Sequence, residues 1–276
     1  MEVLLAEFLG FCYGVKRAIK IARENASTKD NPAATLGPVI HNPQMVARLK
    51  DDGVGAINSL DEMQKGTVII RSHGVGPAIY EEAKEKQLTL VDATCPHVRR
   101  AQLAAKALVD EGYDVVIVGE KNHPEVKSIF EWTGNTAVIV ETEEEANATK
   151  QCAKLGIVSQ TTFSGENFKK ITMALLDKAP EIKIERTICA ATLERQKAAT
   201  KLAEKVDLML VIGGKNSANT TRLYQLCKEK CTTYHIETAE ELSDQWFDKI
   251  KKIGITAGAS TPDWIIKEVY EKCQKK

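Results

Sequence analysis

The sequence predicts an α/β fold built from three related lobes, each with a small, mostly parallel sheet, arranged with pseudo-threefold symmetry. Three observations predict this fold class. The chain repeats itself at a fixed offset, which is the signature of a duplicated structural unit. Short apolar runs alternate with stretches of helical periodicity, as in βαβ units. Three cysteines also occupy corresponding places in the repeats.

The repeat is clearest between the second and third thirds of the chain. A shift of 94 residues superposes a cysteine, a helix-like stretch and a strand end, namely Cys95 on Cys189, Gln102 on Gln196, Ala105 on Ala199, Leu108 on Leu202, Lys121 on Lys215 and Asn122 on Asn216. A fainter copy lies upstream, because Cys12 precedes His41 by 29 residues and Cys95 precedes His123 by 28. We therefore expect lobes at residues 1–93, 94–186 and 187–276.

Within each lobe, a cysteine turn leads into an amphipathic helix, as in Val15–Ala22, and an apolar strand follows. The expected strands are Thr67–Ile70, Val115–Val118, Ala137–Val140, Leu155–Val158, Leu208–Ile212 and Ile253–Thr256. An N-terminal strand is expected at Val3–Phe8, and the sequence does not show whether it pairs within its own lobe or with another. Continuously apolar strands between helices indicate parallel sheets covered on both faces. Ligands of such sheets bind beyond the carboxyl ends of the strands, so the polar residues that follow them are candidate site residues.

Composition limits the partners. Lysine plus arginine (38) equal aspartate plus glutamate (38), so no global field favours nucleic acid or an anionic membrane. Glu2 and Glu7 interrupt the apolar N-terminus, which argues against a signal peptide. No apolar run is long enough to span a membrane. Seven cysteines without a secretion signal indicate reduced thiols in the cytoplasm rather than disulfides.

Cys12, Cys95 and Cys189 are candidate ligands of one iron–sulfur cluster. Thiolates are the usual ligands of such clusters, and a cubane normally takes four of them. Three equivalent lobes would supply three thiolates and leave one iron open. Two alternatives exist: duplication can leave three structural thiols, and zinc also takes three thiolates. Recurrence in register and the absence of paired C-x-x-C ligands favour the cluster.

The remaining cysteines, Cys152, Cys227, Cys231 and Cys273, are expected to be ordinary thiols. Cys227 and Cys231 lie four residues apart in a stretch that reads as a helix over Thr221–Lys230. That spacing could hold half of a metal site, but no second half is visible.

Polar turns after the apolar runs predict an anion pocket. His41, His73 and His123 stand in glycine- or proline-flanked turns, and Ser217, Asn219 and Ser260 occupy the corresponding turns of the last lobe. Imidazoles, hydroxyls and amides suit a compact anion such as a diphosphate.

Two further residues point to proton transfer. Glu125 is the acid of these turns and could be a proton donor facing an open iron, or a solvated surface carboxylate. The Gln160-Thr161-Thr162 turn follows a strand and could orient or relay that proton.

These residues resemble the motifs of the 4-hydroxy-3-methylbut-2-enyl diphosphate reductases, the last enzymes of the non-mevalonate isoprenoid pathway. The similarity runs from end to end, through the turns around Cys12, Cys95, Asn122-His123-Pro124-Glu125, Gln160-Thr161-Thr162, Cys189, Gly214-Lys215-Asn216-Ser217 and Gly258-Ala259-Ser260-Thr261-Pro262-Asp263.

The resemblance implies three α/β lobes around a central [4Fe-4S] cluster, one per chain, whose open iron binds the substrate hydroxyl. Two electrons and protons would then remove that hydroxyl as water, which gives isopentenyl and dimethylallyl diphosphates. His41, His73, His123, Ser217, Asn219 and Ser260 would hold the diphosphate, and Glu125 and Thr161 would govern protonation. A ferredoxin- or flavodoxin-type protein would supply the electrons.

One departure and two rival functions remain. Ala218 stands where many relatives have a second serine, so we expect a tuning effect on binding. A condensing enzyme similar to quinolinate synthase would share the lobes, the cysteines and the open iron, but its carboxylate substrates should need pocket arginines, for which Arg71 alone is weak support. The other rival is a non-catalytic protein that binds diphosphate or metal.

Overall fold

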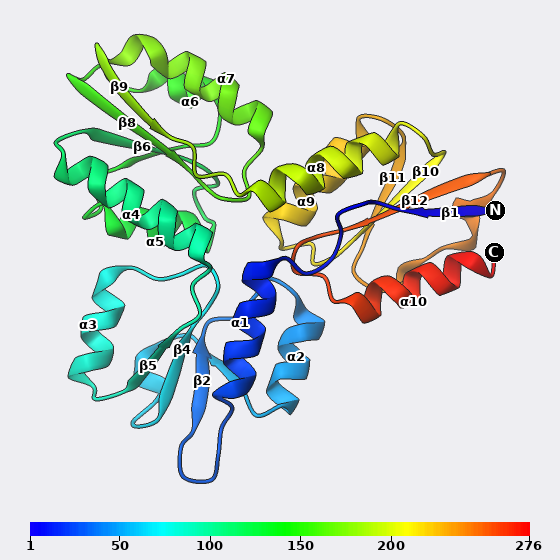
Figure 1. Cartoon of the computed structure of the whole chain (residues 1–276), viewed down its shortest axis with the longest axis horizontal. Helices are drawn as coiled ribbons and strands as arrows, with labels where there is room; N and C mark the ends of the chain where they lie inside the picture. The colour runs from blue at the N-terminus through cyan, green and yellow to red at the C-terminus, as the bar shows by residue number, and fades with distance from the viewer. The chain divides into compact units, whose positions relative to one another are not determined.

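The computed structural model describes all 276 residues (Figure 1). Its contacts divide into two compact units. The first unit comprises residues 1–15, 41–45 and 190–276, and the second comprises residues 16–40 and 46–189. Three four-stranded sheets form the framework, one in the first unit and two in the second, and all of their strand pairs are parallel. The predicted fold class is therefore confirmed.

The first sheet has the strand order β3-β2-β4-β5. Its strands are β2 (Ala33–Leu36), β3 (Gly55–Ile57), β4 (Thr67–Ile70) and β5 (Thr89–Asp92). The helices of this lobe are α1 (Tyr13–Glu24), α2 (Pro43–Asp51) and α3 (Pro77–Glu85), and Figure 1 shows α3 on the opposite side of the sheet from α1 and α2. The central strands β2 and β4 are fully buried.

The second sheet repeats this arrangement in the order β7-β6-β8-β9. Its strands are β6 (Asp114–Val118), β7 (Val138–Val140), β8 (Lys154–Ser159) and β9 (Glu181–Glu185). Figure 1 shows α4 (Pro96–Asp110) and α5 (Pro124–Trp132) on one face and α6 (Glu143–Ala148) and α7 (Gly165–Leu175) on the other.

The third sheet has the order β1-β12-β10-β11. Its strands are β10 (Leu208–Ile212), β11 (Thr232–Ile236), β12 (Lys252–Ala257) and β1 (Glu2–Leu5), and its helices are α8 (Ala190–Ala203), α9 (Ala218–Lys228) and α10 (Asp263–Gln274). The N-terminal strand therefore pairs with the last strand of the chain, in register Glu2 with Lys252. In this sheet β1 occupies the edge position that β5 and β9 hold in the other two sheets.

The N-terminal strand and the helix around Cys227 differ most from their predicted bounds. The N-terminal strand ends at Leu5 instead of Phe8, and the chain then turns at Gly10, whose φ of 73° favours glycine. Helix α9 begins at Ala218 instead of Thr221, because the Ser217 hydroxyl caps it by accepting from the Thr220 amide at 3.4 Å. It ends at Lys228, so Cys231 lies outside the helix.

Equivalent hydrogen bonds show that the repetition is structural. After the first central strand of each sheet, a glycine amide donates to the last residue of the neighbouring edge strand: Gly37 to Ile57 at 2.7 Å, Gly119 to Val140 at 3.0 Å and Gly213 to Ile236 at 2.9 Å. The superposed lysines also agree. The Lys121 amide donates to Glu141 at 2.6 Å and the Lys215 amide to Glu237 at 2.7 Å.

Helix packing follows the same register. A methyl group on Gly156 in β8 would approach Leu108 of α4 to 2.9 Å, and one on Gly254 in β12 would approach Leu202 of α8 to 3.0 Å. Each glycine thus lets the helix that follows the cysteine lie directly on a central strand. Leu108 and Leu202 match in the sequence repeat because each packs against the glycine of a central strand.

Candidate functional site

The predicted site residues follow the six central strands of the sheets. His41 comes after β2, His73 after β4, His123 after β6, Thr161 after β8, Ser217 after β10 and Ser260 after β12. In each sheet the chain leaves its two central strands toward opposite edges, which is the topological switch point where α/β sheets bind ligands. The predicted residues therefore lie at the strand ends where sheets of this class bind ligands.

The three candidate cysteines occupy equivalent backbone positions. The amide of each donates to a carbonyl in the turn after the second central strand of a sheet: Cys12 to Ala259 at 3.1 Å, Cys95 to Ser72 at 2.9 Å and Cys189 to Thr161 at 2.9 Å. Each cysteine also directly precedes the first residue of a helix, α1, α4 or α8. Cysteine sulfur is a common metal ligand, so three cysteines in equivalent positions are candidate ligands of one metal group.

The other four cysteines lie in different surroundings. Burial raises the pKa of Cys227 to about 12 and that of Cys273 to about 11. Burial also raises the pKa of Cys152 and of Cys231. These thiols stay protonated at neutral pH. No disulfide is present.

Glu125 and Thr161 form a buried pair in the second unit. The Glu125 carboxyl accepts the Thr161 amide at 2.5 Å and the Thr161 hydroxyl at 2.9 Å. Glu125 is only 2% exposed, so it is not a solvated surface carboxylate. Burial raises its pKa to about 7, although the two bonds from Thr161 oppose that shift. At neutral pH this carboxyl can hold a proton and also release it.

His73 and His123 lie beside this pair. Their ring centroids are 5.6 Å apart in an edge-to-face arrangement with an interplanar angle of 79°. His123 caps helix α5, because its Nδ1 accepts from the Glu125 amide at 3.2 Å. In the neutral ring, this bond places the proton on Nε2.

In the first unit the structure brings together His41, Ser217 and Ser260. The Ser260 hydroxyl donates to the His41 carbonyl at 3.1 Å and contacts the Ser217 hydroxyl at 3.4 Å. Ser217 caps α9, an 11-residue helix whose N-terminal amides and dipole favour an anion.

Asn219 differs from its neighbours in the first unit. It is 4% exposed, yet neither polar atom of its amide has a hydrogen-bond partner. A buried amide left unpaired costs free energy, so Asn219 is a candidate for binding a ligand that supplies partners.

Sequence reasoning missed the residues behind this site. The sequence singles out Gln102 only by its match with Gln196 in the repeat, and it gives no sign that Ser128 is important. Both are buried polar residues of α4 and α5 that bond to each other at 3.1 Å. The sequence does not show which polar residues of two adjacent helices contact each other, because that depends on how the helices pack.

Two cavities lie in the second unit. One, of about 350 Å³, includes Gly37, Arg71, Gly74, Lys127 and Ser128 in its wall. Burial lowers the pKa of Arg71, while the charge of Glu131 on the same wall opposes that shift. The arginine is thus balanced by a carboxylate, which does not favour a carboxylate-binding site.

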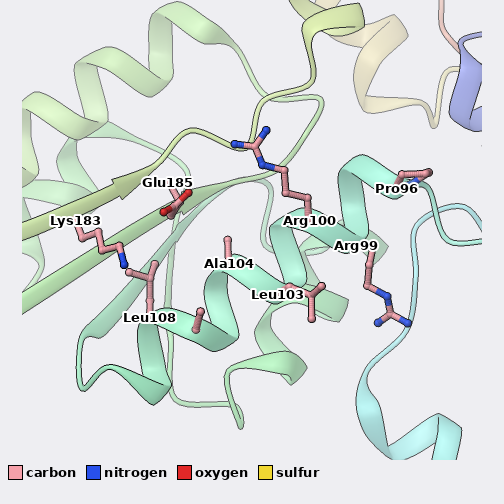
Figure 2. Close-up of a pocket in the computed structure, with 9 residues that line it drawn as sticks. Pro96, Arg99, Arg100, Leu103, Ala104, Leu108, Lys183 and Glu185 are labelled. Atoms are coloured by element: carbon pink, nitrogen blue, oxygen red, sulfur yellow. The ribbon is translucent and has the colours of Figure 1, made fainter.

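The other cavity, of about 480 Å³, runs along α4 toward Lys183 and Glu185 of β9 (Figure 2). It begins at Pro96, the residue after Cys95, but none of the predicted site residues lines it.

No helix of the protein has the length and apolar character needed to span a membrane.

Comparisons with known proteins agree with this geometry. The family model described as LytB protein matches residues 3–274. The 4-hydroxy-3-methylbut-2-enyl diphosphate reductase of Geotalea uraniireducens is 49% identical over 276 residues, which cover 100% of this chain and 98% of the relative. The reductase of that name from Aquifex aeolicus is 47% identical over 279 residues, covering 100% and 96%.

Solved structures are similar too. One, of (E)-4-hydroxy-3-methyl-but-2-enyl diphosphate reductase, the terminal enzyme of the non-mevalonate pathway, has a TM-score of 0.73 at 47% identity and covers 100% of both chains. The E-1-hydroxy-2-methyl-but-2-enyl-4-diphosphate reductase from Plasmodium falciparum has a TM-score of 0.92 at 30% identity, covering 99% of this chain and 87% of that one. With a family model that spans nearly the whole chain and full-length relatives at close to half identity, this chain belongs to the LytB protein family.

Proposed function

We propose that this protein reduces 4-hydroxy-3-methylbut-2-enyl diphosphate to isopentenyl and dimethylallyl diphosphates, the terminal step of the non-mevalonate pathway. Its full-length relatives carry the name of that reductase. The reaction consumes two electrons and two protons, breaks the allylic C–O bond and releases the hydroxyl as water. The protein therefore has to bind a diphosphate, deliver protons beside the leaving oxygen and accept electrons.

The observation that carries the proposal is the equivalence of the three cysteines. Cys12, Cys95 and Cys189 each donate an amide hydrogen bond to the same kind of strand-end carbonyl and each precede a helix N-terminus. Three thiolate donors of one kind, separate from four thiols of raised pKa, fit a [4Fe-4S] cluster, one per chain, with an open iron. When bound, such a cluster supplies the electrons and a Lewis-acid iron for the substrate oxygen.

Neutral donors would hold the diphosphate. We assign this role to His41, His73, His123, Thr161, Ser217, Asn219 and Ser260. The unpaired amide of Asn219, the Nε2 proton of His123 and the N-terminal amides of α9 are the donors with the clearest structural support. The chain carries no net charge, so no global field draws the diphosphate to these donors.

Glu125 and Thr161 would deliver the proton. A carboxyl whose pKa is about 7 is half protonated at neutral pH, and that is near the optimum for a general acid. The Thr161 hydroxyl lies 2.9 Å from the carboxyl and orients it, so the hydroxyl can also pass the proton to a leaving oxygen.

The remaining assignments belong to the same proposal. The lobes at residues 1–93, 94–186 and 187–276 each contribute one cysteine and one set of polar turns. Electrons come from a ferredoxin- or flavodoxin-type donor, and the protein acts in the cytoplasm without nucleic acid or membrane partners.

Anaerobic turnover tests the proposal most directly. Protein purified under strict anaerobiosis should be brown, contain four irons per chain, and convert the allylic diphosphate to both products with dithionite and a viologen mediator. Zinc in place of iron, or iron-loaded protein that releases no isopentenyl or dimethylallyl diphosphate, would reject it.

A further inference from the structure

Ser128 and Gln102 link two parts of the candidate site in the second unit. Ser128 lies on α5, whose N-terminus carries His123 and Glu125, and Gln102 lies on α4. They are 2% and 0% exposed, so their bonds are made with each other and with nearby backbone rather than with solvent. Buried polar groups whose hydrogen bonds are made make the structure around them rigid.

The Ser128 hydroxyl faces two carbonyls at once. It lies 3.0 Å from the carbonyl of His73 and 2.8 Å from that of Glu125. A serine in a helix commonly bonds to the carbonyl three residues earlier, as Ser128 does with Glu125. The contact with His73, 55 residues away in sequence, is not part of the helix. One hydroxyl therefore sets the distance between the His73 turn and the helix that carries Glu125.

Gln102 completes this link from the other side. Its Nε2 donates to Ser128 at 3.1 Å, which leaves the serine proton for the two carbonyls. Gly74 makes the approach possible, because a methyl group there would lie 2.3 Å from the Gln102 Nε2. Gly74 also has a φ of 72°, so it shapes the turn immediately after His73.

The network continues to the turn that holds Cys95. Arg99 donates to Gln102 at 3.2 Å and to Asp92 at 2.9 Å. Figure 2 shows Arg99 and Arg100 leaving α4 in different directions. Asp92 in turn accepts the Thr94 amide at 2.8 Å, next to Cys95. Burial raises the pKa of Asp92, but its hydrogen bonds and the charge of Arg99 outweigh this effect, so the pKa is lowered and the carboxylate stays charged.

We propose that Ser128 and Gln102 are positioning residues that hold the His73 turn against the Glu125 helix. The inference rests on the proposed function for the roles of His73 and Glu125. It adds that the diphosphate side and the proton-donor side of the pocket are set by one buried hydroxyl and one buried amide. Neither residue touches the substrate in this assignment.

The test compares Ser128→Ala with Thr133→Val in the anaerobically purified, iron-loaded protein. Thr133 lies at the end of the same helix, is also 2% exposed, and donates to the Phe130 carbonyl at 2.6 Å without reaching His73. Both changes remove one buried hydroxyl, so both should lower stability by a similar amount. Only Ser128→Ala should also raise KM for the allylic diphosphate, by about tenfold, because it alone releases the His73 turn from the helix that carries Glu125.

Hydrogen exchange supplies a readout that does not depend on turnover. Ser128→Ala should speed amide exchange in residues 71–76 by about fivefold, while Thr133→Val should leave that segment unchanged. Ser128→Thr, which keeps a hydroxyl, should restore slow exchange and a low KM. Should Ser128→Ala fail to fold, Gln102→Met removes the amide at similar volume and should reproduce both effects.

The outcomes separate the two proposals. Wild-type protein that turns over, with normal KM and exchange in both Ser128→Ala and Gln102→Met, overturns the positioning role. Iron-loaded wild-type protein that shows no turnover, with fast exchange of residues 71–76 in Ser128→Ala, rejects the proposed reaction and leaves the structural link intact.

Discussion

The second and third lobes place different chemistry on the same backbone. In α5 the capping residue is His123 and the second helical residue is Glu125, and in α9 these places are taken by Ser217 and Asn219. Glu125 is satisfied within the protein by the amide and hydroxyl of Thr161. Asn219 has no partner for either polar atom.

The difference has a simple origin. Thr161 and Ala259 are equivalent, since their carbonyls accept the amides of Cys189 and Cys12. The second lobe thus has a hydroxyl at this position and the third lobe has none. The equivalent positions therefore hold a carboxyl with partners inside the protein in one lobe and an amide without partners in the other. Substitutions at four kinds of position test this difference between the lobes: the cysteines, Glu125, Asn219 and Ala218. The largest expected effect is that of the cysteines.

The cysteines test what the lobes share. Cys95→Ser or Cys189→Ser should abolish the bound cluster, because serine replaces a thiolate ligand at a helix N-terminus. Cys227→Ser and Cys273→Ser are the matched controls, since these thiols are buried and keep a raised pKa. Iron and sulfide analysis with visible absorbance measures the result. Full iron content in Cys95→Ser would remove that residue from the ligand set.

Glu125→Gln tests the self-contained position. It should lower turnover by roughly 10²–10⁴-fold while iron content and substrate binding persist, because the shape stays and the proton is lost. In the wild type, turnover should fall as pH rises through about 7, where the carboxyl deprotonates. A pH–rate profile of both forms measures this, and a variant with normal kcat would move the donor role elsewhere.

The same change has a predicted effect on stability. The folded pKa of Glu125, about 7, lies above its ordinary value of 4.5, so the folded state binds the proton more tightly. Wild-type stability should therefore fall as pH rises from about 4.5 to 7, by roughly 3 kcal/mol in total. Glu125→Gln should lack this loss, and denaturant unfolding at pH 5 and pH 8 compares the two. Equal pH dependence in both proteins would contradict the raised pKa.

Asn219→Ala tests the open position. It should weaken binding of the allylic diphosphate by about tenfold, because the hydrogen bond from the buried Asn219 amide to a charged ligand is lost. The free energy of unfolding without ligand should change by less than about 1 kcal/mol, because no internal bond is broken. Calorimetric titration and urea unfolding check the two parts. A large loss of stability would show that Asn219 is structural.

Ala218→Ser should have the smallest effect. Ala218 is 9% exposed at the start of α9, between Ser217 and Asn219. An added hydroxyl can contribute one neutral hydrogen bond, so KM for the diphosphate should fall by about two- to tenfold. Steady-state kinetics with the viologen mediator measure the change, and an unchanged KM would place this position outside the pocket.

The sequence predicted the fold class and the repeated cysteine turns because both leave periodic traces. Strands β4 and β10 have the predicted bounds, since each is one uninterrupted apolar run. The position of β1 could not be predicted, because strand pairing across the whole chain leaves no local pattern. The burial of Glu125 and the Gln102–Ser128 bond also escaped, since they depend on how helices pack rather than on spacing.

The pairing of β1 with β12 sets an order on biosynthesis. Cys12 is synthesised well before Ala259, whose carbonyl accepts its amide hydrogen bond. The third sheet is likewise incomplete until β12 has been made. The sheets of the second unit can fold during translation before β12 is made, whereas Cys12 reaches its place only after β12 has been synthesised. Any group that needs this thiol must therefore be inserted after β12 has been made.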